Sequence, residues 1–423
     1  MSNNIKENSS VTPSPSERGP GGEARKILLA FSGGLDTSYC VKYLKDDLSY
    51  EVHTLTVDTG GFSPDEVLKI EQRANDLGVA SHHTIDVTKE YYEKIIRFLI
   101  FGNVLKNQTY PLSVSAERMV QALAVARYAR EINVLAVAHG STGAGNDQVR
   151  FDMALNILAP GLEIITPIRD QRLSREAEIE YLRKKGVQFN FEKAKYSINQ
   201  GIWGTSVGGK ETLNSLGMLP EEAWPTQVTK SGSEKVIITF EKGEPVAINN
   251  KKFTHPVEAI KALQQLAGPF GIGRDIHVGD TIIGIKGRVG FEAAAPMLII
   301  KAHHALEKHV LTKWQLSWKE QLAQFYGNWL HEGQHLDPVM RDIEAFLQNS
   351  QQHVSGDVHI ELHPHRFQIL GIESPYDLMS AKFGKYGEEN LGWTGEDVRG
   401  FTKIFGNQVA IYEAVKKASN KER

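Results

Sequence analysis

The sequence predicts an α/β fold in which a parallel-sheet domain comes first, an α+β domain second and an amphipathic helix last. Short apolar runs at 26–31, 51–57, 81–87 and 133–138 alternate with amphipathic stretches, as in parallel strands joined by crossover helices. After about residue 188, turn-rich segments and expected hairpins replace this alternation. From about Thr394, apolar residues recur at helical spacing.

Several elements carry local start and stop signals. A helix is expected from Ser63 to Gly78, because a hydroxyl cap, a proline and two acids open it and a glycine closes it. Hairpins are expected at 236–249 and at 357–370, the second turning at 363–365, and a helix between Pro256 and Gly268. The expected organisation is a disordered tail at 1–24, domains at 25–188 and 189–393, and one terminal helix at 394–423.

Composition excludes several classes of protein. The 423 residues carry a formal net charge of −3, so we expect no broad basic field and no nucleic-acid partner. The one cysteine, Cys40, rules out intrachain disulfides and four-thiolate metal sites, and we interpret it as a small buried residue. No apolar run reaches the roughly 18 to 20 residues of a membrane span, and no secretory signal is visible. We therefore expect a cytoplasmic protein without a membrane partner.

The strongest local motif is AFSGGLDTS at 30–38, between the first apolar run and a helical stretch. Gly33 and Gly34 permit close backbone approach to a phosphate, and the following helix N-terminus supplies N–H donors. Asp36 is an unusual neighbour for a phosphate unless a magnesium ion lies between them. The alternative interpretation is an ordinary serine-rich helix cap. A Walker-like stretch at 204–210 is not expected to bind phosphate, because Glu211 stands where Ser or Thr is needed.

Two segments resemble a known family. SGGLDTS resembles the PP-loop of the N-type ATP pyrophosphatases, and HGSTGAGNDQVRF at 139–151 resembles HGxTGxGNDQxRF of the argininosuccinate synthase family. Further matches lie at Tyr110, Ser115, 196–197, Ser206, 273–274, 284–288 and 373–375. The resemblance runs from Lys26 to the terminal helix. It implies an adenine nucleotide alpha hydrolase-like first domain, a synthetase second domain and a C-terminal oligomerisation helix in a homotetramer.

The resemblance also implies a reaction. ATP, with magnesium, would adenylate the ureido oxygen of citrulline, and the aspartate amine would then displace AMP from this citrullyl-adenylate to give argininosuccinate in arginine biosynthesis. The implied ATP-binding residues are Ala30, Phe31, Ser32, Gly33, Gly34, Leu35, Asp36, Thr37, Ser38, Val57 and Gly140. Those for aspartate are Thr142, Asn146 and Asp147. Those for citrulline are Tyr110, Ser115, Asn146, Arg150, Ser197, Ser206, Gly279 and Phe291. The catalytic residues would be Asp36, Ser38 and Asn146, and His139 is a weak candidate for a general base.

Two citrulline positions depart from the family pattern. Gly279 stands where the family carries a glutamate that binds the citrulline α-amino group, and Phe291 replaces a tyrosine. Loss of a carboxylate that faces an ammonium suggests an N-acylated substrate, acetyl- or succinyl-citrulline, as an alternative. A second interpretation is that Asp280 or Glu292 supplies the charge, or that the alignment is shifted by one residue. Val57 replaces a family alanine, a smaller change.

Two further classes of protein stay open. Residues 331–335 read HEGQH and match the HExxH pattern of zinc hydrolases, with His331 and His335 as ligands. Gly333 interrupts the expected helix, however, and no third ligand is marked. A scaffold that has lost turnover is the non-enzymatic alternative, and the intact PP-loop argues against it.

Overall fold

The computed structural model describes residues 25–188, 196–379, 384–387, 389–390 and 392–421. The chain divides into two compact units, Met1–Tyr376 and Asp377–Arg423, which are taken separately below. The tail expected to be disordered, 1–24, lies outside the described residues.

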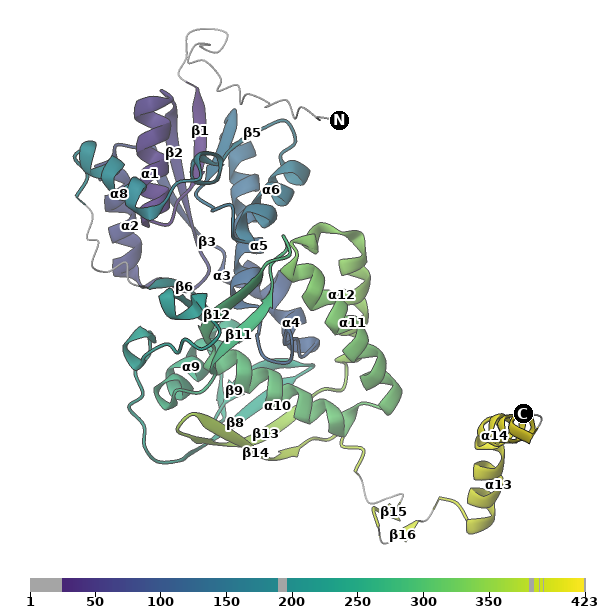
Figure 1. Ribbon diagram of the computed structural model, residues 1–423. Helices are drawn as coiled ribbons and strands as arrows, with labels where there is room; N and C mark the ends of the chain where they lie inside the picture. The colour runs from purple at the N-terminus through teal and green to yellow at the C-terminus, as the bar shows by residue number, and fades with distance from the viewer. Residues whose placement is uncertain (1–24, 189–195, 380–383, 388, 391, 422–423) are drawn as a thin grey trace, which may run out of the picture. The chain divides into compact units, whose positions relative to one another are not determined.

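A five-stranded parallel sheet organises the first part of the larger unit and confirms the predicted α/β fold (Figure 1). Its strand order is β3-β2-β1-β4-β5. The strands are β1 Lys26–Ala30, β2 Glu51–Asp58, β3 Ser81–Asp86, β4 Ala136–His139 and β5 Glu163–Ile165. The first three coincide with the expected apolar runs, and β4 overlaps the run at 133–138 but begins three residues later. β5 was not expected, because three residues are too few to show a pattern.

Helices cover both faces of this sheet. They are α1 Leu35–Lys42, η1 Tyr43–Asp47, α2 Pro64–Leu77, α3 Thr88–Tyr91, η2 Tyr92–Ile96, α4 Arg97–Phe101, α5 Ser113–Glu131, α6 Asp147–Leu158, α7 Pro167–Gln171 and α8 Arg175–Lys184. Ile27 and Leu29 pack in one core with α1 and α2, whereas Leu28 packs in another with α5, because successive strand residues point to opposite faces. The predicted signals of α2 are confirmed: Ser63 forms a capping box with Glu66, and Gly78 ends the helix at φ 81°.

The order of the strands places two loops side by side. From β1 the chain runs outward through β2 and β3, then returns to add β4 and β5 on the other side. Ala30 at the end of β1 pairs with His139 at the end of β4. The loops that leave these two carboxyl ends therefore start next to each other, at the switch point where open α/β sheets bind ligands.

The second part of the larger unit is α+β, as predicted. A four-stranded sheet has the order β11-β12-β7-β6 and a five-stranded sheet the order β10-β9-β8-β13-β14. The strands are β6 Ser197–Gly201, β7 Gly204–Gly208, β8 Glu234–Glu241, β9 Glu244–Ile248, β10 Lys251–Lys252, β11 Arg274–Asp280, β12 Lys286–Glu292, β13 Gly356–His363 and β14 Arg366–Glu373. Both expected hairpins are confirmed as the antiparallel pairs β8–β9 and β13–β14.

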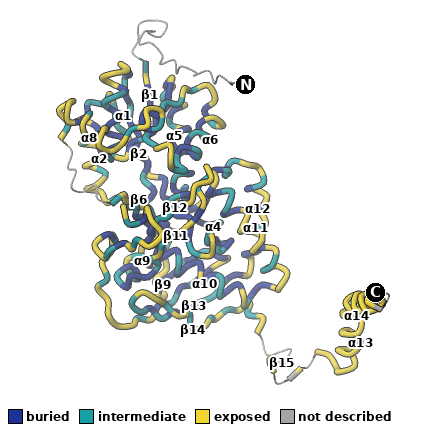
Figure 2. Tube along the Cα trace, in the orientation of Figure 1, coloured by how far each residue is buried: buried dark blue, intermediate teal, exposed yellow. Residues whose placement is uncertain are grey.

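Helices α9 Pro256–Ala267, α10 Ala294–Val310, α11 Lys313–His331 and α12 Pro338–Ser350 complete this part, with short segments η4 Lys210–Leu213, η5 Glu221–Ala223, η6 Gly268–Phe270 and η7 Gln334–Leu336. α9 has the predicted bounds. Figure 2 shows a buried interior beneath exposed helix and loop surfaces. That interior includes one ion pair, in which Lys319 Nζ on α11 lies 2.8 Å from Glu307 Oε2 on α10, both side chains being fully buried.

The smaller unit contains β15 Gly384–Lys385, β16 Glu389–Asn390, α13 Gly395–Phe405 and α14 Asn407–Lys421. The prediction of one continuous helix from Thr394 is wrong, because the helix breaks at Gly406, a residue with low helix propensity. Phe401, Ile404 and Phe405 are exposed, so no described residue of this unit covers the predicted apolar face. No described helix is both long and apolar enough to cross a bilayer.

Candidate active site

The predicted phosphate loop connects β1 to α1. Gly33 adopts φ 72°, a conformation that side chains other than glycine rarely take. The Ser38 hydroxyl donates to the Gly34 carbonyl at 2.7 Å, and the Ser32 and Thr37 hydroxyls lie 3.3 Å apart. The loop is therefore preorganised by its own hydroxyls, with the start of α1 facing the space above it.

A second glycine closes the same space from β4. A Cβ built on Gly140 would lie 3.3 Å from Thr37 Cγ2 and 3.4 Å from Asp36 Cβ, so the backbone after β4 packs directly on the first turn of α1. Val57, near the end of β2, is buried, and β2 pairs with β1, the strand that leads into the phosphate loop. Any side chain at position 140 would begin to fill the space above the phosphate loop. With glycine there, that space fits the pyrophosphate of a nucleotide.

Asp36 faces a second carboxyl group. Glu178 on α8 is buried, and burial together with the charge of Asp36 and a hydrogen bond to it raises the pKa of Glu178 to about 8. Glu178 is thus protonated at neutral pH, and the two groups share a proton rather than two negative charges. Among the described residues, no cluster of three or more His, Cys, Asp or Glu side chains could hold a metal. A magnesium ion here would depend mainly on phosphate oxygens.

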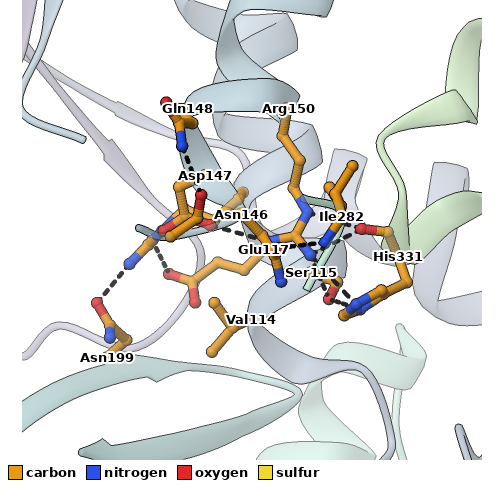
Figure 3. Close-up of polar contacts among 12 residues, drawn as sticks. Val114, Ser115, Glu117, Asn146, Asp147, Gln148, Arg150, Asn199, Ile282 and His331 are labelled. Atoms are coloured by element: carbon orange, nitrogen blue, oxygen red, sulfur yellow. Dashed lines mark hydrogen bonds and ion pairs between the residues drawn. The ribbon is translucent and has the colours of Figure 1, made fainter. Parts of the chain in front are cut away.

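The loop after β4 leads into α6, whose first residue, Asp147, bonds two arginines. Figure 3 labels Asp147 and one of them, Arg150. Asp147 Oδ2 accepts from Arg118 Nε at 3.1 Å, and Asp147 Oδ1 accepts from Arg150 Nη1 at 2.8 Å. Burial raises the pKa of Asp147, but the two guanidinium groups outweigh it and hold the pKa below its usual value. Asp147 is therefore ionised, and α5 and α6 are tied together at this point.

Arg150 links this pair to the second part of the unit. Its Nη2 donates to the Ser115 hydroxyl at 3.0 Å and to the carbonyl of His331 at 2.7 Å, while Nε donates to the same carbonyl at 3.0 Å. Nδ1 of His331 lies 2.9 Å from the Ser115 hydroxyl. Burial and then the charge of Arg150 lower the pKa of His331 to about 3, so its imidazole is neutral.

The β11–β12 hairpin and β6 approach from the opposite side. The Ile282 N–H donates to Asn146 Oδ1 at 2.8 Å. Asn199 on β6 accepts from Arg118 and donates to the hydroxyl of buried Ser206 at 3.4 Å. The walls of the site therefore come from both parts of the unit, because Arg118 contacts Asn199 and Asn146 contacts Ile282. Figure 3 shows the contact between Asn146 and Ile282.

Three rings, those of Tyr110, His277 and Phe291, pack together in this part of the chain. The Tyr110 ring stacks on His277 with centroids 5.0 Å apart and lies 5.3 Å from the Phe291 ring. The Tyr110 hydroxyl accepts from the Val114 N–H at 2.9 Å, which fixes it against the start of α5. Gly279 lies on the same strand face as His277, two residues along β11, and both are buried.

The suggestion that Asp280 or Glu292 replaces the missing glutamate is not supported. Asp280 is exposed, and its carboxylate pairs with Lys286 at 2.6 Å. Glu292 is buried but pairs with Arg274 at 3.3 Å. Gly279 pairs with Gly287 in regular antiparallel register, so the strand has no bulge at this point. Each carboxylate is therefore already paired with a cation of the chain.

The structure also contradicts the zinc interpretation. α11 ends at His331, and Gly333 takes φ 81°, so the two histidines do not share a helix face. His331 contacts Ser115, whereas Nδ1 of His335 faces Arg341 at 3.4 Å.

The Walker-like stretch at 204–210 contains strand β7, which pairs with β6 and β12.

Several contact residues were missed from the sequence. They are Thr59, Glu117, Arg118, Asn199 and His277, while His331 was assigned to a zinc site instead. Arg118 follows Ser115 by three residues, as Arg150 follows Asp147, and this helical spacing was an available signal. Of the predicted residues, Thr142 and Ser197 are exposed. His139 is buried and bonds Asp152 at 2.9 Å, which indicates a structural role.

Comparison with known proteins gives the family. The model of the arginosuccinate synthase N-terminal HUP domain matches residues 26–188, and the model of the arginosuccinate synthase C-terminal domain matches residues 196–412. The chain belongs to the argininosuccinate synthase family. Members of this family are ATP-dependent ligases that form a carbon–nitrogen bond.

Individual members of the family are similar in sequence to this chain over nearly its full length. Argininosuccinate synthase of Methanocaldococcus jannaschii is 40% identical over 93% of this chain and 99% of its own. That of Dictyoglomus thermophilum is 38% identical, and that of Xanthomonas campestris 36%, each with the same coverage of both chains. A solved structure described as a predicted subunit of tRNA methyltransferase from M. jannaschii has a TM-score of 0.29 at 19% identity, covering 38% of this chain and 74% of that one, and carries no conclusion.

Proposed function

We propose that this protein is an argininosuccinate synthase, which joins citrulline and aspartate at the expense of ATP and releases AMP and pyrophosphate. The observation that carries the proposal is the pairing of β1 with β4, because it sets the PP-loop against Gly140 and the Asp147–Arg150 helix in a chain that both family domains match. The activity belongs to arginine biosynthesis.

The phosphate loop is proposed to hold MgATP. The loop at 30–38, Val57 and Gly140 would surround the nucleotide, with the N-terminus of α1 directed at its phosphates. Ser38 and Asp36 would lie at the α-phosphorus. Magnesium would enter the site bound to the ATP phosphates. Asp36 is the loop side chain whose carboxylate could contact the ion. The ureido oxygen of citrulline attacks the α-phosphorus and pyrophosphate leaves.

The remaining network is proposed to position the two amino acids. Thr142, Asn146 and Asp147 would bind aspartate, whose amine attacks the activated carbon and displaces AMP. Citrulline would lie along Tyr110, Ser115, Asn146, Arg150, Ser197, Ser206, Gly279 and Phe291. Most of the rate enhancement would come from positioning and charge stabilisation, since the described residues offer no well-placed general base.

The organisation of the molecule is also a proposal. Residues 25–188 would bind the nucleotide and 189–393 the amino acids. The exposed apolar face of α13 and α14 supports assembly into a homotetramer, which the mass of the particle in solution would test. We propose a cytoplasmic location. The comparisons give no support to the N-acylated alternative.

The direct test is release of AMP and pyrophosphate from MgATP. Omission of either citrulline or aspartate should reduce the formation of argininosuccinate to background. Hydrolysis of ATP to ADP, or AMP release that needs neither amino acid, would contradict the proposal. The absence of any turnover would instead favour an inactive scaffold.

A further inference from the structure

His277 has a buried nitrogen that nothing in the described part of the chain satisfies. Its imidazole is almost fully enclosed, and Nδ1 has no hydrogen-bond partner among the described residues. A buried polar atom without a partner costs about 1 to 3 kcal/mol, so such atoms are rare in folded proteins. An unsatisfied nitrogen inside a ligand site is a candidate contact for the ligand.

The position of His277 places it in the citrulline part of the site. Its ring stacks on Tyr110. The strand that carries it ends at Asp280, whose carbonyl contacts His331, and Ile282 in the following turn contacts Asn146. Electrostatic interaction with His277 is also one of the causes that lower the pKa of His331, so the His277 imidazole lies near the network of Ser115 and Arg150.

Gly279 is what allows the imidazole to lie there. A Cβ built on Gly279 would be 2.5 Å from Nε2 of His277 and 3.1 Å from its Cε1. Real Cβ atoms do not approach other atoms so closely, so a side chain at 279 and the observed imidazole exclude each other. His277 thus occupies the space that a side chain at 279 would need.

The imidazole is uncharged. Burial, and then the nearby charge of Lys106, lower the pKa of His277. A neutral imidazole has one nitrogen that donates and one that accepts, so it can bond an N–H group without requiring a positive charge on it.

We propose that His277 is a specificity-determining residue that binds the α-nitrogen of the ureido substrate through Nδ1. This assignment rests on the proposed function for the identity of the substrate. The neutral imidazole accepts a hydrogen bond from the α-nitrogen whether or not that nitrogen is charged. A carboxylate at the same place would favour a positively charged α-nitrogen. His277 positions the substrate and takes no part in bond making.

Three variants test the assignment, with the full-length protein titrated calorimetrically with citrulline and with Nα-acetylcitrulline. His277→Asn keeps a polar atom near the place of Nδ1 and should bind each compound within about threefold of wild type. His277→Leu should weaken both by about tenfold, as expected for one lost hydrogen bond, while ATP affinity stays unchanged. His277→Asp should shift the ratio of the two dissociation constants about tenfold or more towards citrulline, because a carboxylate prefers an ammonium.

The ratio of the two dissociation constants distinguishes a direct contact of His277 with the α-nitrogen from a role of His277 in packing alone. An unchanged ratio in His277→Asp, with both affinities lowered in parallel, would overturn the proposal, as would equal losses in His277→Asn and His277→Leu. Binding of neither compound to the wild type would overturn it as well. Binding that responds to these variants as expected, in a protein that forms no argininosuccinate, would contradict only the proposed function.

Discussion

Arg150 and Ser115 are hydrogen-bonded to each other, with Arg150 Nη2 3.0 Å from the Ser115 hydroxyl. Both are proposed citrulline residues. The same guanidinium also bonds Asp147 and the carbonyl of His331, so its donors are held in one plane before any substrate binds. A fixed arginine loses little conformational freedom on binding, which favours precise orientation of the ureido group.

Arg150→Lys is expected to lower kcat/KM for citrulline by about 100-fold, since an ammonium cannot replace a planar group that bonds three partners at once. Steady-state kinetics with citrulline as the varied substrate measure the effect. Arg366→Lys, at an exposed position on β14, is the matched control and should behave as wild type. Equal behaviour of the two variants would show that the Arg150 network is not needed for the reaction.

Gly140→Val is expected to raise the Kd for ATP by about tenfold or more. Its Cβ alone would lie 3.3 Å from Thr37 Cγ2, and the additional methyl groups would enter the space above the phosphate loop. Binding of ATP, measured by calorimetry, checks this. Gly232→Val has no neighbour within 4 Å of its Cβ and serves as control. Unchanged ATP affinity in Gly140→Val would place the nucleotide elsewhere.

Glu178 should make stability depend on pH. Its pKa is about 8 in the folded protein, against an ordinary value of 4.5, so the folded state binds the proton more tightly. Stability therefore falls as pH rises from about 4.5 through about 8. Glu178→Gln removes this contribution, so the decrease in Tm between pH 5.5 and 8.5 should shrink.

Glu180→Gln is the control for that prediction. Glu180 lies on the same helix, and a hydrogen bond from Lys184 lowers its pKa, so it stays ionised across this pH range. Its Tm profile should keep the wild-type shape. Identical profiles for all three proteins would show that Glu178 does not share a proton with Asp36.

Lys319→Met should destabilise the protein by about 3–5 kcal/mol, because it leaves the fully buried Glu307 carboxylate without its cation. Urea unfolding measures the loss. The double variant Lys319→Met/Glu307→Leu removes both charges and should recover much of the stability. A double variant as unstable as the single one would show that the loss comes from packing rather than from an unpaired charge.

Local signals in the sequence account for what was predicted correctly. The Ser63 cap and Gly78 define α2, and Gly33 defines the turn between β1 and α1, because each depends on a few adjacent residues. Contacts between distant segments were not visible. His331 joins Ser115 across 216 residues, and its HExxH context suggested zinc instead. His277 has no motif at all, and only the packing of β11 against Tyr110 reveals it.

The most direct test of the central claim follows one oxygen atom. Citrulline labelled with ¹⁸O in its ureido group is incubated with the protein, MgATP and aspartate, and the AMP is analysed by mass spectrometry. Attack of the ureido oxygen on the α-phosphorus predicts that each AMP formed carries one ¹⁸O atom. Formation of unlabelled AMP together with argininosuccinate would contradict adenylation of citrulline as the activating step.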